Sequence, residues 1–491
     1  MLFNSPIFLF AFLPIVFSGY YLLHRLGSRN GGRVWLVLAS LLFYGYWNPV
    51  YLLLMIPSIV VNFLTGERLQ RLRRADPSGH GTGIRRLLAA GVTLNLGLLA
   101  YFKYSDFFIA NLNWAAGTQL PLLHLTLPLA ISFFTFTQIA YLVDCYRKEL
   151  HEYDFLNYAL FVTFFPHLIA GPIIHHGEMM PQFASRRSGV INWRNITVGL
   201  CLFSVGLLKK VAVADPLSTW ANDGFANAAR LTLLDGWATS LSYTLQLYFD
   251  FSGYCDMANG AALLFNIRLP VNFNSPYKAA DIQDFWRRWH MTLSRWLRDY
   301  LYISLGGNRD GRLRTLLNVF LTFLLGGLWH GAAWTFVIWG ALHGLAVAVH
   351  RVWQWTGLRL PRAAGWAVTM LFVIVAWVFF RARTVADAVQ VLRAMGGLNG
   401  VVLPYQISPA LARLGLGHAP LGNLVVIDIP RLVAYLVIFS SVALLLPNAV
   451  ALFGFAERRR LRIAHALIGA GGFAASLLFL GAPSEFLYFD F

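Results

Sequence analysis

The sequence predicts an all-α polytopic membrane protein, and three features of its 491 residues lead to this fold class. Hydrophobic residues make up 57% of the chain and charged residues only 12%, and the mean hydropathy is +0.58. A water-soluble globule carries about twice that charged fraction, so soluble, fibrous and disordered classes are excluded. Apolar runs long enough for a bilayer recur along the chain, and basic residues collect in alternate connections between them.

Twelve runs have the length and composition of membrane-spanning helices, at about 20 residues for a hydrocarbon core of about 30 Å. They are residues 6–23, 33–47, 49–65, 87–102, 124–144, 195–214, 231–250, 314–330, 332–350, 364–380, 431–447 and 464–481. The first run has no basic residue before it and no cleavage site after it, which predicts a retained span rather than a signal peptide. A thirteenth run, 155–174, is interrupted by Pro and Gly, so we expect a re-entrant segment there.

The net charge of +17 arises from 39 Lys and Arg residues against 22 Asp and Glu residues. If the N-terminus lies outside, 30 of those 39 basic residues fall in inner connections or at the adjoining helix ends, Arg33 and Arg314. The inner connections are then 24–32, 66–86, 145–194, 251–313, 351–363 and 448–463. The excess charge therefore predicts orientation in a membrane, with both termini outside, rather than a nucleic-acid partner. We expect one domain over 1–491, with its core at about 124–350 and an outer loop at about 381–430.

Ionisable side chains at membrane depth are costly, so each group of them marks a candidate site. Residues 245–260 place Asp250, Asp256 and Asn259 among aromatic residues. Two acids without further oxygen ligands at fixed spacing do not make a metal pattern, and no metal is predicted. Hydrogen bonds to backbone or to nearby arginines are the alternative role. In the broken run 164–176, His167 is either a packing residue of a kinked hairpin or part of a polar cavity.

Residues 284–309 combine aromatic and basic side chains at helical spacing, which predicts an amphipathic helix at the cytoplasmic surface. The alternative to a substrate role is an anchor on anionic lipid headgroups. His290 falls on the apolar face rather than beside the arginines. The apolar face comprises Phe285, Trp286, Trp289, Leu293, Trp296, Leu297 and Tyr300, and the basic face comprises Arg287, Arg288, Arg295 and Arg298.

The run 324–344 surrounds His330 with glycines and places Trp329, Trp334 and Trp339 where they can wall a pocket. An imidazole in such a site can take a proton from a hydroxyl, which suits general-base chemistry. The alternative is a helix-packing histidine beside small residues, and His343 is a weaker candidate of the same kind. The chain has no GxSxG elbow, HExxH motif or P-loop, and its three cysteines (Cys145, Cys201 and Cys255) are expected to be buried thiols.

These motifs together resemble the membrane-bound O-acyltransferase (MBOAT) family, in particular its bacterial alginate O-acetyltransferase-like branch. The resemblance rests on FWRRWH followed forty residues later by GGLWHG, and on YFDFSGYCDMA, LPVNFNSPY, MLFNSPIFLFAFLP, FFPHLIAGPI and EFLYFDF. Cys255 departs from the pattern, where a serine is expected, but the neighbouring acids are kept.

The resemblance implies a core in which helices and re-entrant segments surround a funnel and tunnel through a thinned bilayer. It also implies that His330 is the catalytic histidine and His290 the second characteristic polar residue. The candidate substrate-binding residues are Trp329, Trp334, Asp250, Asn272, Arg287 and Arg288. No cofactor is expected to be bound, and the donor substrate is acetyl-CoA, whose phosphates the basic segment 278–314 could hold.

By the same resemblance we expect a multi-pass protein of the bacterial inner membrane that contacts membrane lipid. Its acetyl group would pass to periplasmic SGNH-type partner proteins and the polysaccharide secretion machinery, for O-acetylation of an exported polysaccharide such as alginate or cellulose. A D-alanyl or peptidoglycan/teichoic-acid acyltransferase of the same family is the first alternative. A proton-coupled transporter is the second, although the chain lacks an evident inverted repeat.

Overall fold

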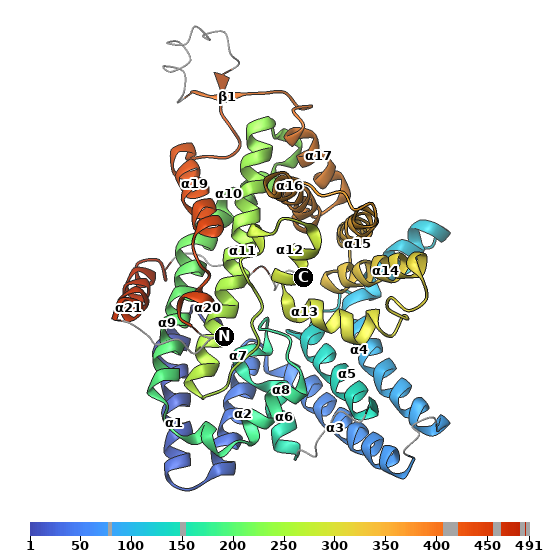
Figure 1. Ribbon diagram of the computed structural model, residues 1–491, viewed down its shortest axis with the longest axis vertical. Coiled ribbons are helices and arrows are strands. Elements are labelled where there is room, and N and C mark those ends of the chain that lie inside the picture. Colours follow the sequence, from blue (N-terminus) through green and yellow to red (C-terminus); the bar gives the residue numbers. More distant parts are fainter. Residues whose placement is uncertain (77–80, 148–153, 406–420, 455–462, 482–486, 488–491) are drawn as a thin grey trace.

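A computed structural model describes residues 1–76, 81–147, 154–405, 421–454, 463–481 and 487 (Figure 1). In this part of the chain, seven helical segments are long and apolar enough to cross a membrane. They are Phe8–Arg25, Pro49–Ala75, Thr82–Ala116, Trp193–Ala226, Arg312–His330, Trp334–Trp355 and Arg362–Arg381. Two shorter apolar helices, Ile429–Leu445 and Ile463–Leu477, accompany them. The prediction of an all-α polytopic fold is therefore confirmed.

The N-terminal helices form one side of the molecule, coloured blue to cyan in Figure 1. They are η1 (Phe8–Phe12), α1 (Leu13–Arg25), α2 (Arg29–Gly45), η2 (Pro49–Tyr51), α3 (Leu52–Ala75), α4 (Thr82–Ala116) and α5 (Ile131–Arg147). Local sequence sets their ends: Ser28 caps α2 by accepting a hydrogen bond from the Gly31 amide, and α4 stops at Gly117, whose φ is +65°. Their buried faces share one hydrophobic cluster.

The centre of the molecule is α11 (Leu233–Leu264), whose side chains are buried over most of its length. It packs against α9 (Trp193–Leu208), η4 (Lys209–Ala214) and α10 (Asp215–Ala226), which run on as one helical segment. Glycines allow the close approach, since a Cβ on Gly206 would lie 2.6 Å from the Gly253 carbonyl oxygen. The other side of the molecule is formed by α14 (Arg312–His330), α15 (Trp334–Trp355), α16 (Arg362–Arg381) and α17 (Val385–Met395).

Short elements connect these groups. They are α6 (Phe155–Thr163), α7 (Phe165–Leu168), α8 (His176–Ala184), η3 (Arg186–Gly189), η5 (Ala228–Arg230), η6 (Pro276–Lys278), α12 (Ile282–Arg288), α13 (Met291–Trp296), η7 (Leu297–Tyr302), β1 (Leu403–Pro404), β2 (Leu421–Gly422), α19 (Ile429–Leu445), α20 (Ala449–Leu452) and α21 (Ile463–Leu477). The two strands pair in parallel. In Figure 1, α12 and α13 lie in the middle of the molecule, between the N-terminal helices and α14–α16.

Each predicted span contains a helix, but those at 33–47, 124–144 and 231–250 are not among the described helices that are long and apolar enough to cross a membrane, and several limits differ. The run predicted at 124–144 is helical only from Ile131, because the backbone before it is broken and Ala130 has a φ of 58°. The run 155–174 is divided between α6, α7 and an extended stretch, as its Pro and Gly residues predict. The expected outer loop 381–430 contains α17 and the strand pair, and its residues 406–420 lie outside the described residues. The closing motif EFLYFDF also lies outside them, apart from Leu487.

The prediction of one amphipathic surface helix over 284–309 is wrong in two respects. The segment is divided into α12, α13 and η7, because His290 takes a left-handed conformation with a φ of 44°. Its aromatic face also packs inside the protein, where Phe285 is 0% and Leu293 is 1% exposed. Protein side chains rather than lipid therefore cover this face.

Candidate active site

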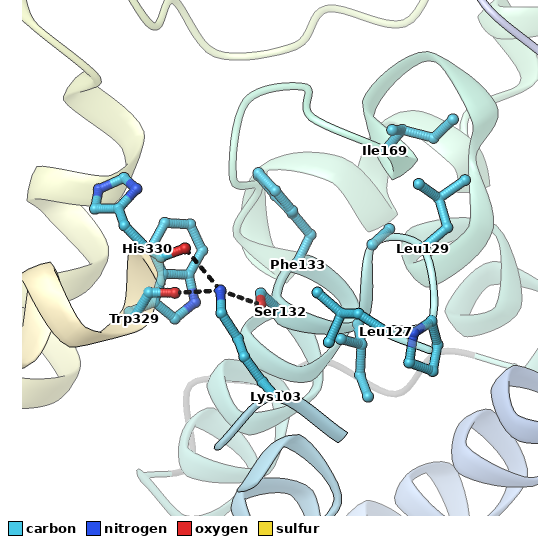
Figure 2. Close-up of a pocket in the computed structure, with 11 residues that line it drawn as sticks. Lys103, Leu127, Leu129, Ser132, Phe133, Ile169, Trp329 and His330 are labelled. Carbon is cyan, nitrogen blue, oxygen red and sulfur yellow. Dashed lines mark hydrogen bonds between the residues drawn. The ribbon is translucent and has the colours of Figure 1, made fainter. Parts of the chain in front are cut away.

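His330 is the last residue of α14 and lies where the hydrophobic clusters of the two sides of the molecule meet (Figure 2). Its side chain is 5% exposed. The ring packs edge-on against Trp339 and Phe380, both at 5.1 Å between centroids, and against Trp329 at 4.9 Å. Within the described part of the chain, no hydrogen bond is made by either ring nitrogen of His330. The ring is thus held by aromatic packing while its nitrogens remain available to a substrate.

The backbone at the end of α14 is held by two side chains of α4. The Lys103 ammonium group donates to the carbonyl oxygens of Trp329 at 2.7 Å and His330 at 2.9 Å (Figure 2). The Tyr104 hydroxyl donates to the Leu328 carbonyl at 2.7 Å. The last carbonyls of a helix have no partner within the helix, and a cation is favoured at this negative end of the helix dipole. Lys103 and Tyr104 therefore fix the position from which the His330 ring projects.

A cavity of about 40 Å³ adjoins His330 and is lined by polar and apolar groups. Its lining residues include Lys103, Ser132, Ile169, Trp329 and His330 (Figure 2). A second cavity, of about 300 Å³, is lined by Lys103 and Leu127 as well, and also by Asp106, Gly331 and Phe336. Because Gly331 lines the larger cavity, that cavity adjoins the end of α14 from which His330 projects.

His290 is buried at 1% exposure, between α12 and α13. It lies close enough to His330 for the two rings to interact electrostatically. Its Nδ1 lies 3.1 Å from the Asn272 side-chain oxygen, and its Nε2 is buried without a hydrogen-bond partner among the described residues. Few non-glycine residues adopt the left-handed backbone conformation, and those that do are concentrated at functional sites. Burial lowers the pKa of the His290 ring to about 3, so the ring is neutral at physiological pH.

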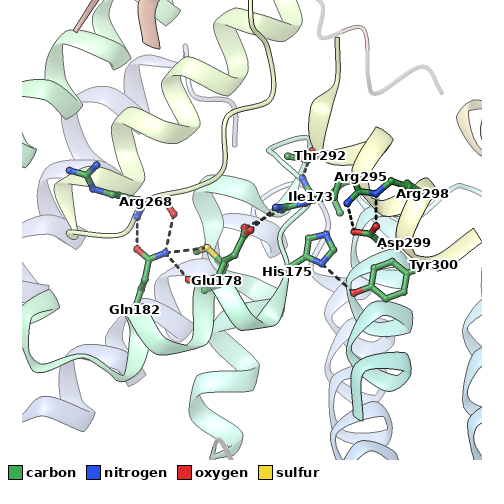
Figure 3. A network of polar contacts seen from close by, with 11 residues as sticks. Ile173, His175, Glu178, Gln182, Arg268, Thr292, Arg295, Arg298, Asp299 and Tyr300 are labelled. Atoms are coloured by element: carbon green, nitrogen blue, oxygen red, sulfur yellow. Dashed lines mark hydrogen bonds and ion pairs between the residues drawn. The ribbon is translucent and has the colours of Figure 1, made fainter. Parts of the chain in front are cut away.

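Asn272 fixes the orientation of His290. Its side-chain oxygen accepts from the Thr292 hydroxyl at 2.9 Å as well as from His290. The Thr292 hydroxyl in turn accepts from the Ile173 amide at 2.9 Å (Figure 3). Because the Asn272 side-chain oxygen can only accept a hydrogen bond, Nδ1 of His290 must carry the proton that is donated to it. Nε2 of the neutral ring is then unprotonated and carries a lone pair. The broken segment 155–174 is thereby connected to the second histidine through hydrogen bonds.

Asp250 has a partner inside the protein. Its carboxylate lies 2.7 Å from the Lys210 ammonium group, which also lies 2.7 Å from the Asp215 carboxylate. The neighbouring Lys209 pairs with Asp256 at 2.6 Å. Buried acids are normally paired, and here the partners are lysines of η4 rather than the arginines expected from the sequence. These pairs join η4 to α11, and a substrate-binding role for Asp250 stays a prediction.

The remaining candidates are placed differently relative to His330. Trp329 lines the small cavity, whereas Trp334 is not among the residues that line it, is 55% exposed and donates to the Asn111 side chain at 2.9 Å. Arg287 is exposed, and Arg288 pairs with Asp284 within α12 at 2.8 Å. Their substrate-binding roles stay predictions.

Two other histidines of interest pack in the core. His343 is fully buried, and its Nδ1 accepts from the Trp286 indole at 3.2 Å. His167 is buried, and its Nε2 lies 3.1 Å from the Phe161 carbonyl oxygen. The three cysteines are free and buried, as expected. Gly327 also serves helix packing, since a Cβ on Gly340 of α15 would lie 3.0 Å from its Cα.

Lys103 is a functional candidate that the sequence analysis missed. The signal was present, because a lysine within the apolar stretch LLAYFKYSDFFIA is an ionisable group at membrane depth. Its partners, however, are backbone carbonyls more than two hundred residues away, which local spacing cannot reveal.

Replacing Lys103 by methionine is expected to lower kcat by about 10- to 100-fold, because the carbonyls of Trp329 and His330 lose their donor and the His330 ring is less well placed. KM for the acyl donor should change by less than about threefold, and Lys103→Arg should restore part of the activity. Steady-state kinetics of the purified variants measure both. A loss confined to KM, or equal losses in the Met and Arg variants with unchanged folding, would contradict a positioning role.

Comparison with known proteins identifies the family. Residues 81–386 match the model of the MBOAT, membrane-bound O-acyltransferase, family. The chain is 49% identical over 433 residues to a peptidoglycan O-acetyltransferase of Helicobacter pylori, covering 82% of this chain and 81% of the relative. It is 42% identical over 432 residues to the probable alginate O-acetylase AlgI of Pseudomonas aeruginosa, covering 87% and 79%. A teichoic acid D-alanyltransferase of Bacillus subtilis is 27% identical over 234 residues, covering 46% and 59%. These findings favour an enzyme over the transporter alternative, and the chain belongs to the membrane-bound O-acyltransferase family as a multi-pass O-acyltransferase.

Proposed function

We propose that this protein transfers the acetyl group of cytoplasmic acetyl-CoA to a glycan on the other side of the inner membrane, with His330 as general base. The observation that carries the proposal is the His330 ring itself. It is buried beside a cavity, has no hydrogen-bond partner in the described structure, and projects from a helix end fixed by Lys103. A neutral imidazole in such a place can accept a proton from an acceptor hydroxyl.

In the proposed step, the acceptor oxygen attacks the carbonyl carbon of the thioester while His330 takes the hydroxyl proton. The carbon–sulfur bond breaks, and the coenzyme A sulfur leaves and receives that proton from His330. The products are the acetyl ester and free coenzyme A. Base catalysis of this kind contributes about 10²- to 10⁴-fold, and the remaining acceleration comes from positioning in a site from which water is excluded.

His290 has a different role in this proposal. Its Nδ1 proton is directed to Asn272, so Nε2 can accept a hydrogen bond but cannot donate one to a developing oxyanion. An amide N–H on the pantetheine arm of the donor is a group of the right kind. We therefore assign His290 to donor positioning and His330 to proton transfer.

The proposed donor side is the basic face of the protein. Nine of the basic residues lie between Arg268 and Arg314, on the side that the positive-inside rule assigns to the cytoplasm. Arg287 is exposed there and is available to a phosphate, whereas Arg288 is already paired with Asp284.

Arg287→Gln is therefore expected to raise KM for acetyl-CoA about 3- to 10-fold. The lost phosphate contact is equally strong in the bound substrate and in the transition state, so kcat should be unchanged. The effect should shrink as salt is added. Arg85→Gln removes the same charge from another exposed position on the same predicted side and should leave KM unchanged. If both substitutions raised KM equally, the effect would come from the overall positive charge of this side, and a specific contact between Arg287 and the donor would be contradicted.

The acceptor is proposed to be an extracytoplasmic polysaccharide, reached with the help of a periplasmic SGNH-type partner and the secretion machinery. Residues 381–430 contain no nucleophile motif that could serve in place of such a partner. An alginate- or cellulose-type polymer is one candidate acceptor. Peptidoglycan is the second, and the 49% identity to a peptidoglycan O-acetyltransferase favours it.

The donor and acceptor can be tested with wild-type protein in nanodiscs. Labelled acetyl-CoA is supplied with alginate oligosaccharides or muropeptides, with and without the partner protein, and a D-alanyl carrier protein serves as the alternative donor. We expect coenzyme A release from acetyl-CoA and label on one of the glycans. Consumption of the D-alanyl carrier with acetyl-CoA left intact would overturn the proposed donor.

A further inference from the structure

A basic cavity lies away from the active site, between η3, the start of α9 and the strip that follows α11. Its volume is about 590 Å³. Three arginines, Arg187, Arg194 and Arg268, line it, and no Asp or Glu is among its described lining residues. The other lining residues are Gln182, Ser185, Ser188, Asn192, Asn195 and Asn266. The composition is that of an anion site, because guanidinium groups bind phosphate oxygens in pairs and amides add neutral donors.

Hydrogen bonds hold the walls of this cavity in place. Asn266 donates to the carbonyl oxygens of Ser188 at 3.0 Å and Val190 at 2.7 Å. The Gln182 side chain accepts a hydrogen bond from the Arg268 backbone amide at 2.8 Å and donates one to the Arg268 carbonyl oxygen at 3.1 Å (Figure 3). Three separate segments are thereby joined around one space, so a ligand meets a preformed site rather than a flexible charged surface.

Exposed apolar residues alternate with the lining residues in the sequence. Trp193, 74% exposed, lies between the lining residues Asn192 and Arg194, and Val190 (63% exposed) and Ile191 (47% exposed) lie between Ser188 and Asn192. The membrane-spanning segment Trp193–Ala226 begins at this point, and Leu200, two turns further along it, is 51% exposed. Tryptophan at the end of a span is typical of the membrane–water interface. The cavity therefore lies where lipid headgroups lie, with apolar side chains continuing toward the acyl chains.

We propose that this cavity binds the headgroup phosphate of an anionic phospholipid on the cytoplasmic leaflet. Basic pockets at the cytoplasmic ends of spans recognise such headgroups. The nucleotide part of coenzyme A offers the same phosphate chemistry, but the exposed apolar side chains of Val190, Ile191 and Trp193, which neighbour the lining residues in the sequence, favour a ligand that carries acyl chains. The proposal does not depend on the acyl-transfer reaction.

The test is a lipid titration of the delipidated full-length protein, followed by native mass spectrometry. Dioleoylphosphatidylglycerol is compared with dioleoylphosphatidylcholine, and adenosine 3′,5′-bisphosphate is added as a competitor. The variants are Arg187→Gln and the double variant Arg187→Gln/Arg194→Gln. Arg186→Gln is the matched control, because Arg186 is an exposed neighbour with the same charge that does not line the cavity.

We expect tighter binding of phosphatidylglycerol than of phosphatidylcholine by about tenfold, and a loss of about tenfold in the double variant. Arg187→Gln should show part of the loss and Arg186→Gln none. If the double variant does not fold, the comparison of the two single variants decides. Equal affinity for both lipids, equal losses for Arg186→Gln and Arg187→Gln, or displacement of phosphatidylglycerol by the bisphosphate would overturn the proposal.

Discussion

Replacing His330 by glutamine is expected to lower kcat for acetyl transfer by about 10²- to 10⁴-fold, which is the contribution of general-base catalysis. Glutamine retains polar atoms and similar bulk against Trp339 and Phe380 but cannot take the hydroxyl proton. KM for acetyl-CoA should change little, because the base acts in the transition state and not on the bound donor. Release of coenzyme A by the purified variant measures both parameters.

His343→Gln is the matched control for this experiment. His343 is a buried histidine whose Nδ1 only accepts a hydrogen bond from Trp286, and glutamine can preserve that bond. We expect its kcat to stay within about fivefold of wild type. If His343→Gln lost as much activity as His330→Gln while both variants folded, burial of a histidine rather than base chemistry would explain the loss.

The second large effect is expected on stability. Lys210→Met leaves the buried carboxylates of Asp215 and Asp250 without their shared cation, and breaking a buried ion pair costs about 3–5 kcal/mol. Thermal unfolding of the purified protein should show a marked drop in Tm. Lys278→Met, at a half-buried lysine that donates to the Leu446 carbonyl, should cost about 1 kcal/mol.

Asp250→Asn distinguishes the structural role of this residue from the predicted substrate role. A structural role predicts a lower Tm with KM close to wild type, because the Lys210 pair is weakened. A substrate role predicts a raised KM with Tm unchanged. A wild-type Tm in both Lys210→Met and Asp250→Asn would contradict the account of these ion pairs.

Hydropathy predicted a helix in each apolar run well, because an apolar run at membrane depth must satisfy its backbone groups within a helix. The helices in the predicted spans 33–47, 124–144 and 231–250, however, are not among those long and apolar enough to cross a membrane in the described part of the chain. The residues at which the helices begin and end were less predictable. The first residues of the predicted span 124–144 contain Pro128 and the left-handed Ala130, so α5 begins late, at Ile131. No Gly or Pro marks the break at His290, where tertiary contacts to Asn272 impose a left-handed backbone. The periodicity of 284–309 therefore predicted a continuous helix that does not form.

For the candidate site, local motifs drew attention to His330 and His290, but not to the residues that hold them. Lys103 and the adjacent pair Lys209 and Lys210 lie within apolar runs, and they could have been noticed as charges at membrane depth. Their partners are distant in sequence, so only the packing of α4 on α14 and of η4 on α11 reveals what they do. Trp334 illustrates the converse, since its spacing suggested a pocket wall and the structure exposes it.

Transfer across the membrane through the His330 site is tested most directly in sided proteoliposomes. Labelled acetyl-CoA is confined to the arginine-rich face, and the acceptor glycan with its partner protein is confined to the other face. We expect label on the glycan with wild-type protein, none with His330→Gln, and none when acetyl-CoA is moved to the acceptor face. Full labelling by His330→Gln, or labelling with donor and acceptor both on the acceptor face, would contradict this expectation.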